Sequence, residues 1–167
     1  MEFNSAKSFY AVGLLLTVLG LGVIGVLLML IGLYSLSRHY SRFTIFTNAL
    51  YAVIISAVGV LAAVATLFIF YPAYPRYVGW ETPLELATAW LVLSVFVAAA
   101  AYLMKKSFAE LYEVSKVELF KTAATLTLIG GLTAVVLVGY IILFIAFILA
   151  TIAAFSLKPQ QAGALEF

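Results

Sequence analysis

The chain has 167 residues, of which 66% are hydrophobic and 10% charged, with a net charge of +2 and a mean hydropathy of +1.19. A water-soluble domain of this length cannot bury so much apolar surface, so the composition excludes a soluble enzyme or binding module and predicts an integral membrane protein. The small positive charge favours anionic lipid headgroups as neighbours and gives no support to nucleic-acid binding.

Charged residues stand in short patches, and four uncharged tracts run between them: residues 8–37, 43–75, 86–104 and 122–157. A helix rises about 1.5 Å per residue and the hydrocarbon layer is about 30 Å thick, so the third tract is one crossing. The second tract is also one crossing, because Pro72 and Pro75 end its helix. As a single helix the last tract would span about 54 Å, so we expect it to fold back. The first tract would span about 45 Å, so its length alone does not decide between one tilted helix and two helices.

The first tract is interrupted by Gly20-Leu21-Gly22. Glycine permits the positive φ of a tight turn, so we expect segments 6–20 and 22–38 to form a hairpin. The alternative is one tilted helix in which these glycines serve close packing. Gly13 with Gly20, and Gly25 with Gly32, are each seven residues apart and form a small-residue seam.

The second tract predicts one long segment, 44–70. Small residues recur along it at spacings of three and four: Ala49, Ala52, Ser56, Gly59 and Ala63. Such a seam lets helix backbones approach in lipid, and it predicts either packing within the chain or an interface between subunits. Asn48 lies about one turn inside the tract, where its amide needs a hydrogen-bonding partner, so it marks either a polar pocket or a contact between helices.

The third segment, 83–104, begins at Thr82-Pro83-Leu84-Glu85, which has the residues of a helix N-cap, first turn and capping box. The linker 105–118 after it has an amphipathic pattern, with Phe108, Leu111 and Tyr112 on its apolar stripe. It predicts either a cytoplasmic helix that docks a partner or an extension of the flanking helices at the headgroups.

The last tract is too long for one crossing, and either Gly130-Gly131 or Gly139 marks its reversal. We therefore expect segments 119–138 and 140–157. The whole chain, 1–167, is predicted to be one all-α domain: a polytopic transmembrane bundle of six segments, with a central pair between two terminal hairpins. Four or five crossings remain the alternative.

Basic residues predict the orientation, because cytoplasmic loops carry an excess of lysine and arginine. With six segments and both termini inside, every basic residue except Arg76 is cytoplasmic. Four crossings with the same loops inside would put Lys7 and Lys158 outside. We expect a multi-pass protein of the cell membrane with both termini in the cytoplasm. A basic patch is predicted on that face: Arg38, His39, Arg42, Lys105 and Lys106.

Groups for chemistry are scarce in the sequence. It contains no cysteine, no aspartate and a single histidine, His39. This excludes, within one chain, a haem held by two histidines, a multi-histidine metal site and a serine-histidine-aspartate triad. We therefore expect no catalytic residue, no cofactor and no metal.

The string Ile45-Phe46-Thr47-Asn48-Ala49-Leu50-Tyr51-Ala52 resembles a family of small archaeal integral membrane proteins known as domain of unknown function 996. Leu119-Phe120-Lys121-Thr122 and the closing Ala153-Ala154-Phe155-Ser156-Leu157-Lys158 belong to the same resemblance. It covers most of the chain and implies an archaeal cell membrane. It implies no activity and no catalytic residues.

Three classes of function remain. A non-catalytic accessory or assembly subunit, or a self-associating membrane protein, agrees with the small-residue seams, and its partners would be lipids, further copies or a larger membrane complex. A small-solute transporter or channel agrees with glycine-broken tracts but lacks intramembrane charges. A membrane enzyme lacks an acid, base or nucleophile. A polar cavity would favour transport if it were lined by Asn48, Ser56, Thr66, Thr88 and Ser94.

Overall fold

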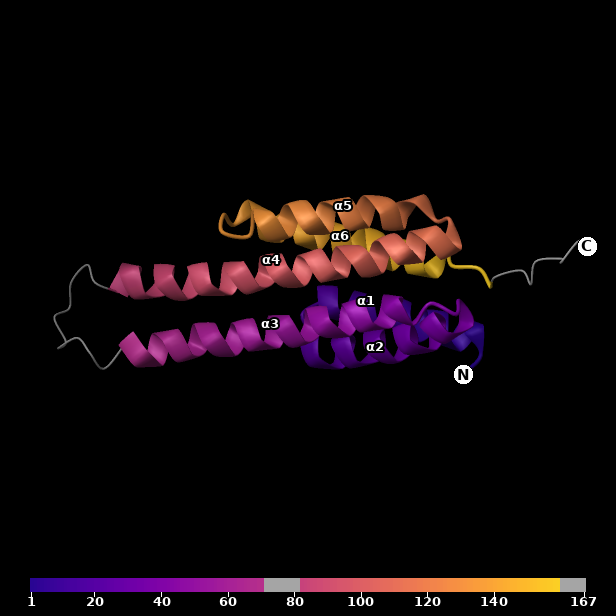
Figure 1. Ribbon diagram of the computed structural model, residues 1–167, viewed down its shortest axis with the longest axis horizontal. Coiled ribbons are helices and arrows are strands. Elements are labelled where there is room, and N and C mark those ends of the chain that lie inside the picture. The colour runs from indigo at the N-terminus through magenta and orange to yellow at the C-terminus, as the bar shows by residue number, and fades with distance from the viewer. Residues whose placement is uncertain (71–81, 160–167) are drawn as a thin grey trace, which may run out of the picture.

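The computed structural model describes residues 1–70 and 82–159, except for the side chains of residues 70 and 82–85. The described residues form six α-helices and no β-strand. The helices are α1 (Phe3–Val18), α2 (Gly22–His39), α3 (Phe43–Phe70), α4 (Thr82–Ser115), α5 (Glu118–Leu132) and α6 (Val138–Phe155). They pair as three hairpins, with α3 and α4 between the two terminal ones (Figure 1). The predicted all-α bundle of six segments is confirmed.

The first reversal lies at the expected glycines. Gly20 has φ +86°, and no atom lies within 4 Å of the position its Cβ would take. A positive φ favours glycine over any residue with a side chain, and this turns the chain between α1 and α2. The first tract is therefore a hairpin rather than one tilted helix.

The second reversal lies between the two glycine sites that the sequence offered. α5 ends at Leu132, six residues earlier than expected, and α6 begins at Val138. Thr133 donates its hydroxyl hydrogen bond to the carbonyl of Ile129 at 2.7 Å. The Trp90 indole of α4 donates to the carbonyl of Val135 at 3.0 Å. The bond from Trp90 satisfies a backbone carbonyl of the turn, whereas the Ile129 carbonyl also accepts the backbone N–H of Thr133 at the end of α5.

α4 continues without a break through the linker to Ser115. The amphipathic stretch is thus an extension of a flanking helix, which was one of its two interpretations. Its apolar stripe is buried within the chain, because Phe108 and Leu111 are almost completely inaccessible. The predicted capping contacts of Thr82 and Glu85, and the loop 71–81, lie outside the described residues or side chains.

The central hairpin is longer than the terminal hairpins. α3 and α4 have 28 and 34 residues, whereas α1, α2, α5 and α6 have 16, 18, 15 and 18. The N-terminus, the end of α6 and the short loop 40–42 lie at one end of the molecule, and the terminal hairpins cover only that part of α3 and α4 (Figure 1). Among the described helices, four are long and apolar enough to cross a membrane: α2, α3, α4 and α6.

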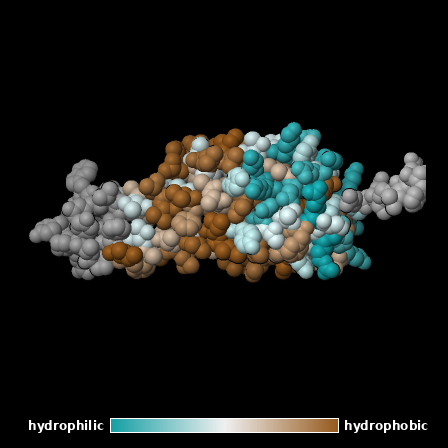
Figure 2. All heavy atoms as spheres, viewed as in Figure 1, coloured by the Kyte–Doolittle hydropathy of each residue, from teal (hydrophilic) through white to brown (hydrophobic). Residues whose placement is uncertain are grey.

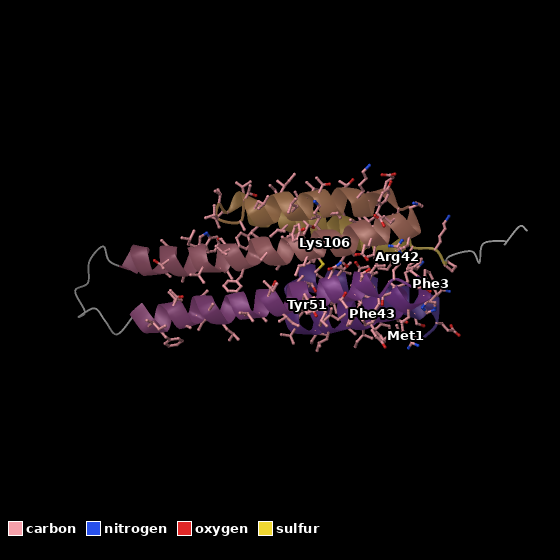
Figure 3. All side chains as sticks on the ribbon, viewed as in Figure 1. Met1, Phe3, Arg42, Phe43, Tyr51 and Lys106 are labelled. Carbon is pink, nitrogen blue, oxygen red and sulfur yellow. The ribbon has the colours of Figure 1, made fainter. Side chains whose placement is uncertain are left out.

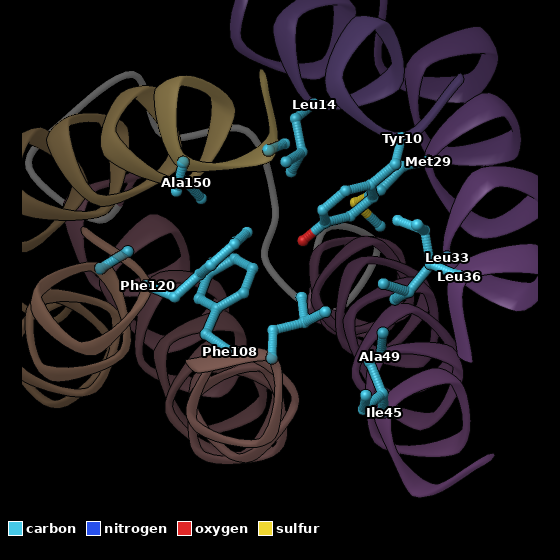
Figure 4. Close-up of a cluster of buried hydrophobic side chains, with 14 of the residues drawn as sticks. Tyr10, Leu14, Met29, Leu33, Leu36, Ile45, Ala49, Phe108, Phe120 and Ala150 are labelled. Carbon is cyan, nitrogen blue, oxygen red and sulfur yellow. The ribbon is translucent and has the colours of Figure 1, made fainter. Parts of the chain in front are cut away.

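Polarity is distributed along the same axis. Hydrophilic residues gather at the end that carries the termini, and hydrophobic residues cover the middle (Figure 2). The buried cluster lies between the hairpins and includes Tyr10, Leu36, Ile45, Phe108 and Phe120 (Figure 4). α1 also contacts α6, so the two terminal hairpins meet and close the bundle at this end.

Candidate functional site

The small-residue seam of α3 lies inside the molecule, where α3 packs against α4. Ala49 and Ala52 are almost fully buried, and a Cβ on Gly59 would lie 2.9 Å from Cγ of Phe96 on α4. Ser56 is half-buried, and Ala63 is buried. These five residues therefore pack the chain against itself in this structure.

Glycines also bring α1 and α2 unusually close together. A Cβ on Gly25 of α2 would lie 2.5 Å from the backbone nitrogen of Thr17, and one on Gly32 would lie 2.7 Å from Cα of Tyr10. A Cβ on Gly13 of α1 would lie 2.6 Å from Cα of Met29. The two helix backbones are thus in direct contact, which small residues permit in a lipid environment.

Asn48 contributes to a polar contact between helices. Its Nδ2 donates a hydrogen bond to Oε1 of Glu110 on α4 at 3.0 Å. The hydroxyl of Thr44 donates to the other carboxylate oxygen of Glu110. One turn away, the buried hydroxyl of Ser107 donates to the carbonyl of Ile45 at 2.8 Å. We call Thr44, Asn48, Ser107 and Glu110 the polar clasp. It joins the first turns of α3 to the polar extension of α4.

Of the four residues of the clasp, the sequence indicated Asn48, and Thr44, Ser107 and Glu110 were missed; Glu110 is the residue that receives the bond from Asn48. Its spacing from Lys106 suits a surface ion pair on one helix, but Lys106 instead lies over the ring of Tyr102, 4.7 Å from its centroid. The usable signal was the amide of Asn48, which needed a partner at its own depth.

We expect the Asn48–Glu110 bond to couple α3 and α4 measurably. Asn48→Leu and Glu110→Leu should each lower stability, and a double-mutant cycle should give a coupling energy of about 1–2 kcal/mol, because hydrogen bonds to charged groups exceed neutral ones. Denaturation by SDS in mixed micelles, followed by circular dichroism, measures this. Additive single effects would contradict the expectation. Thr125→Val, whose exposed hydroxyl bonds only within α5, is the control.

The residues of the predicted basic patch lie on α2, on the loop after it and on α4. Arg38 lies over the ring of Tyr34, and Arg42 pairs with Glu113 of α4 at 3.8 Å. Lys106 is exposed on α4, and Lys105 is half-buried. Arg42 and Lys106 belong to different elements in the half of the molecule that carries the termini (Figure 3). Nδ1 of His39 donates a hydrogen bond to the carbonyl of Ser35 at 2.9 Å.

The chain end after α6 is bound to the first hairpin. The ammonium of Lys7 donates to the carbonyl of Leu157 at 3.3 Å, and the hydroxyl of Tyr40 donates to the carbonyl of Lys158 at 2.8 Å. Burial raises the pKa of Tyr40 to about 12, so its hydroxyl keeps the proton that it donates. These two bonds close the polar end of the bundle.

A cavity of about 570 Å³ lies among all six helices. It extends from Gly22, beside the first turn, to Met104, which directly precedes Lys105. Its lining is almost entirely aliphatic or aromatic. The hydroxyl-bearing residues in it are Thr17, Ser56 and Thr127. Two of these hydroxyls donate to carbonyls of their own helices, Thr17 to Gly13 at 2.8 Å and Thr127 to Ala123 at 2.7 Å.

The polar side chains expected around a solute pathway are not gathered in this cavity. Asn48 bonds to Glu110, and Thr66 and Ser94 donate to Ala62 and Trp90 of their own helices. Of that set Ser56 lines the cavity. The hydroxyls of Tyr10 and Tyr140 are buried without a hydrogen-bond partner among the described residues. Tyr10 projects into the core cluster beside Met29 (Figure 4).

No group of three metal-ligating side chains occurs in the described parts of the chain. The fold and its four long apolar helices define the class of the protein: a multi-helix membrane protein whose contacts between polar side chains gather at one end. The family model described as "Protein of unknown function (DUF996)" matches residues 21–148. The chain belongs to this family, so the resemblance seen in the sequence is confirmed.

One relative supports the same assignment. An uncharacterized protein of the archaeon Methanocaldococcus jannaschii is 27% identical over 169 residues, covering 96% of each chain. No solved structure matches this one.

Proposed function

We propose that the protein is a non-catalytic accessory or assembly subunit of a membrane complex. The observation that carries this proposal is the uncovered part of the central hairpin. α3 and α4 continue past the turns of both terminal hairpins (Figure 1). In this extension Phe68 and Ile69 of α3, and Leu86 of α4, are largely exposed. An apolar two-helix extension with no covering helix of its own is a surface on which helices of another subunit can pack.

The test is mild extraction of the tagged protein from native membranes, followed by mass spectrometry of the proteins that co-migrate. We expect reproducible membrane partners, and we expect Leu86→Trp to reduce their recovery at least fivefold. Ile141→Trp, an equally exposed position on α6, is the control. Co-migration of this chain alone as a dimer would assign the surface to self-association. A solitary monomer that conducts solutes in liposomes would contradict the proposal.

Transport of a polar solute is the second class of function compatible with the sequence, and the lining of the cavity gives it little support. Ligand pockets that select polar molecules place several polar groups toward one point. Here two of the three lining hydroxyls are bonded to their own helices. An enzymatic role would likewise need a set of convergent acid, base or nucleophilic groups.

The proposed arrangement in the membrane places both termini in the cytoplasm. Along α4, Lys105 and Glu85 are separated by about 30 Å of helix, the thickness of the hydrocarbon layer. The terminal hairpins turn short of the far boundary. Trp90, which bonds the turn between α5 and α6, lies about 22 Å from the Lys105 level. We therefore infer that α3 and α4 cross the bilayer and that the terminal hairpins enter and leave from the cytoplasmic side.

A further inference from the structure

We propose that the cavity holds one hydrocarbon chain of an anionic phospholipid from the cytoplasmic leaflet, with Arg38 binding the phosphate. This site rests on the membrane position proposed above. It adds a ligand and a route by which the ligand enters.

The first step is the position of the cavity. It lies on the hydrocarbon side of Lys105, between Met104 and the turn at Gly22. Because its lining is apolar, water gains few hydrogen bonds there, and water in a cavity needs two to four polar partners. A volume of about 570 Å³ is within the usual range for bound organic ligands. In a bilayer, the apolar groups that are available to fill such a cavity are the hydrocarbon chains of lipids.

The second step is the opening. Among the lining residues, Val23 and Leu27 of α2 and Val60 of α3 are more than half exposed. α2 and α3 share few contacts, and the other lining helices form the far wall. The cavity therefore opens sideways between α2 and α3, where a lipid chain can enter without crossing the polar end.

The third step is a surface path from this opening to a cation. Leu27, Ile31, Tyr34 and Arg38 follow one another at helical spacing on α2, and all four are exposed. Leu27 and Arg38 are separated by about 16 Å along the helix axis, close to half of the hydrocarbon thickness of about 30 Å. A phospholipid with its phosphate at Arg38 can thus place the end of one chain in the cavity.

The fourth step is charge complementarity. A second hollow, of about 490 Å³, is lined by Arg38 together with Met1, Ile31, Tyr34, Ser35 and His39. Arg38 forms no ion pair with a carboxylate among the described residues, whereas Arg42 pairs with Glu113. A guanidinium that is free of carboxylates is suited to a phosphate, which it can bind through two parallel hydrogen bonds.

The test uses the full chain reconstituted in vesicles of phosphatidylglycerol and phosphatidylcholine in a 1:4 ratio. Flotation with the vesicles is checked first, and failure to float would overturn the membrane position rather than the lipid site alone. The protein is then extracted in mild detergent and analysed by native mass spectrometry. We expect one retained phosphatidylglycerol per chain despite its lower abundance.

Two kinds of variant test separately the cavity, which binds the hydrocarbon chain of the lipid, and Arg38, which binds its phosphate. Val26 lies half-buried in the cavity wall, and Val26→Trp should fill part of the cavity and lower the retained lipid at least fivefold. Ser56→Leu fills the cavity with a smaller side chain and should also lower the retained lipid at least fivefold. Val95→Trp on the lipid-exposed face of α4 is the control. Arg38→Gln should reduce the preference for phosphatidylglycerol about fivefold, as expected for one basic residue near an anionic headgroup, while Lys116→Gln should not.

Equal retention by Val26→Trp, Ser56→Leu and the wild type, with unchanged circular dichroism, would overturn the proposal. Retention of phosphatidylcholine in proportion to its abundance would also overturn it, because Arg38 would then have no part in binding. So would a wild-type spectrum that shows only detergent.

Discussion

Replacing Gly32 by alanine is expected to separate α1 from α2 and to destabilise the protein by at least about 3 kcal/mol, the upper part of the range for overpacked cores. The added Cβ would lie 2.7 Å from Cα of Tyr10 and 2.8 Å from the carbonyl oxygen of Ala6. Both are backbone atoms, so no rotation of a side chain relieves the contact. The midpoint of thermal unfolding in detergent, followed by circular dichroism, measures the loss.

Gly22→Ala is a control with the same chemical change. No atom lies within 4 Å of the Cβ position at Gly22, which begins α2. Alanine in a helix is favoured over glycine by roughly 0.5–1 kcal/mol, so this variant should unfold at the same temperature or higher. Equal midpoints for Gly32→Ala and Gly22→Ala would show that α1 and α2 are not in backbone contact.

The sequence predicted the helices better than it predicted their ends. Charge placement and tract length were sufficient for six all-α segments, because hydrocarbon thickness limits what one helix can span. The turn after α5 was misplaced because it depends on a tertiary bond, from Trp90 to the carbonyl of Val135, that no local pattern encodes. Gly130, which looked like a turn residue, instead packs against Leu143 of α6.

The candidate sites show the same division between local and tertiary information. Spacing identified the seam from Ala49 to Ala63, but spacing cannot say which surface a seam meets: Gly59 meets Phe96 of α4, whereas Ala52 and Ser56 line the cavity. Asn48 stood out because a buried amide needs a partner, yet the partner, Glu110, is distant in sequence and had a plausible neighbour in Lys106. The cavity could not be predicted at all, since residues from all six helices line it.

We expect the turns of the terminal hairpins to be protected from chemical labelling on both sides of the membrane. The native chain has no cysteine, so single substitutions are readily interpreted. Cysteines near Glu2 and Gln160 should react with an impermeant maleimide only when it is supplied on the cytoplasmic side, and a cysteine at Gly79 only from outside. Cysteines at Leu19 and Leu137 should react from neither side.

The physical reason is that both turns are apolar and, in the proposed arrangement, end inside the hydrocarbon layer. Leu19 is 67% exposed and Leu137 71% exposed in the protein, so lipid rather than packing must shield them. Backbone groups at such depth must be paired within the protein, and the turn after α5 has bonds from Val136 to Thr133, from Gly139 to Val136 and from the indole of Trp90. Detergent should therefore make both cysteines reactive at once.

Labelling of Leu137→Cys from outside in intact vesicles would mean that α5 and α6 cross the bilayer. Labelling of cysteines near Glu2 and Gln160 from outside would mean that the termini lie outside the cell and that the proposed orientation is reversed.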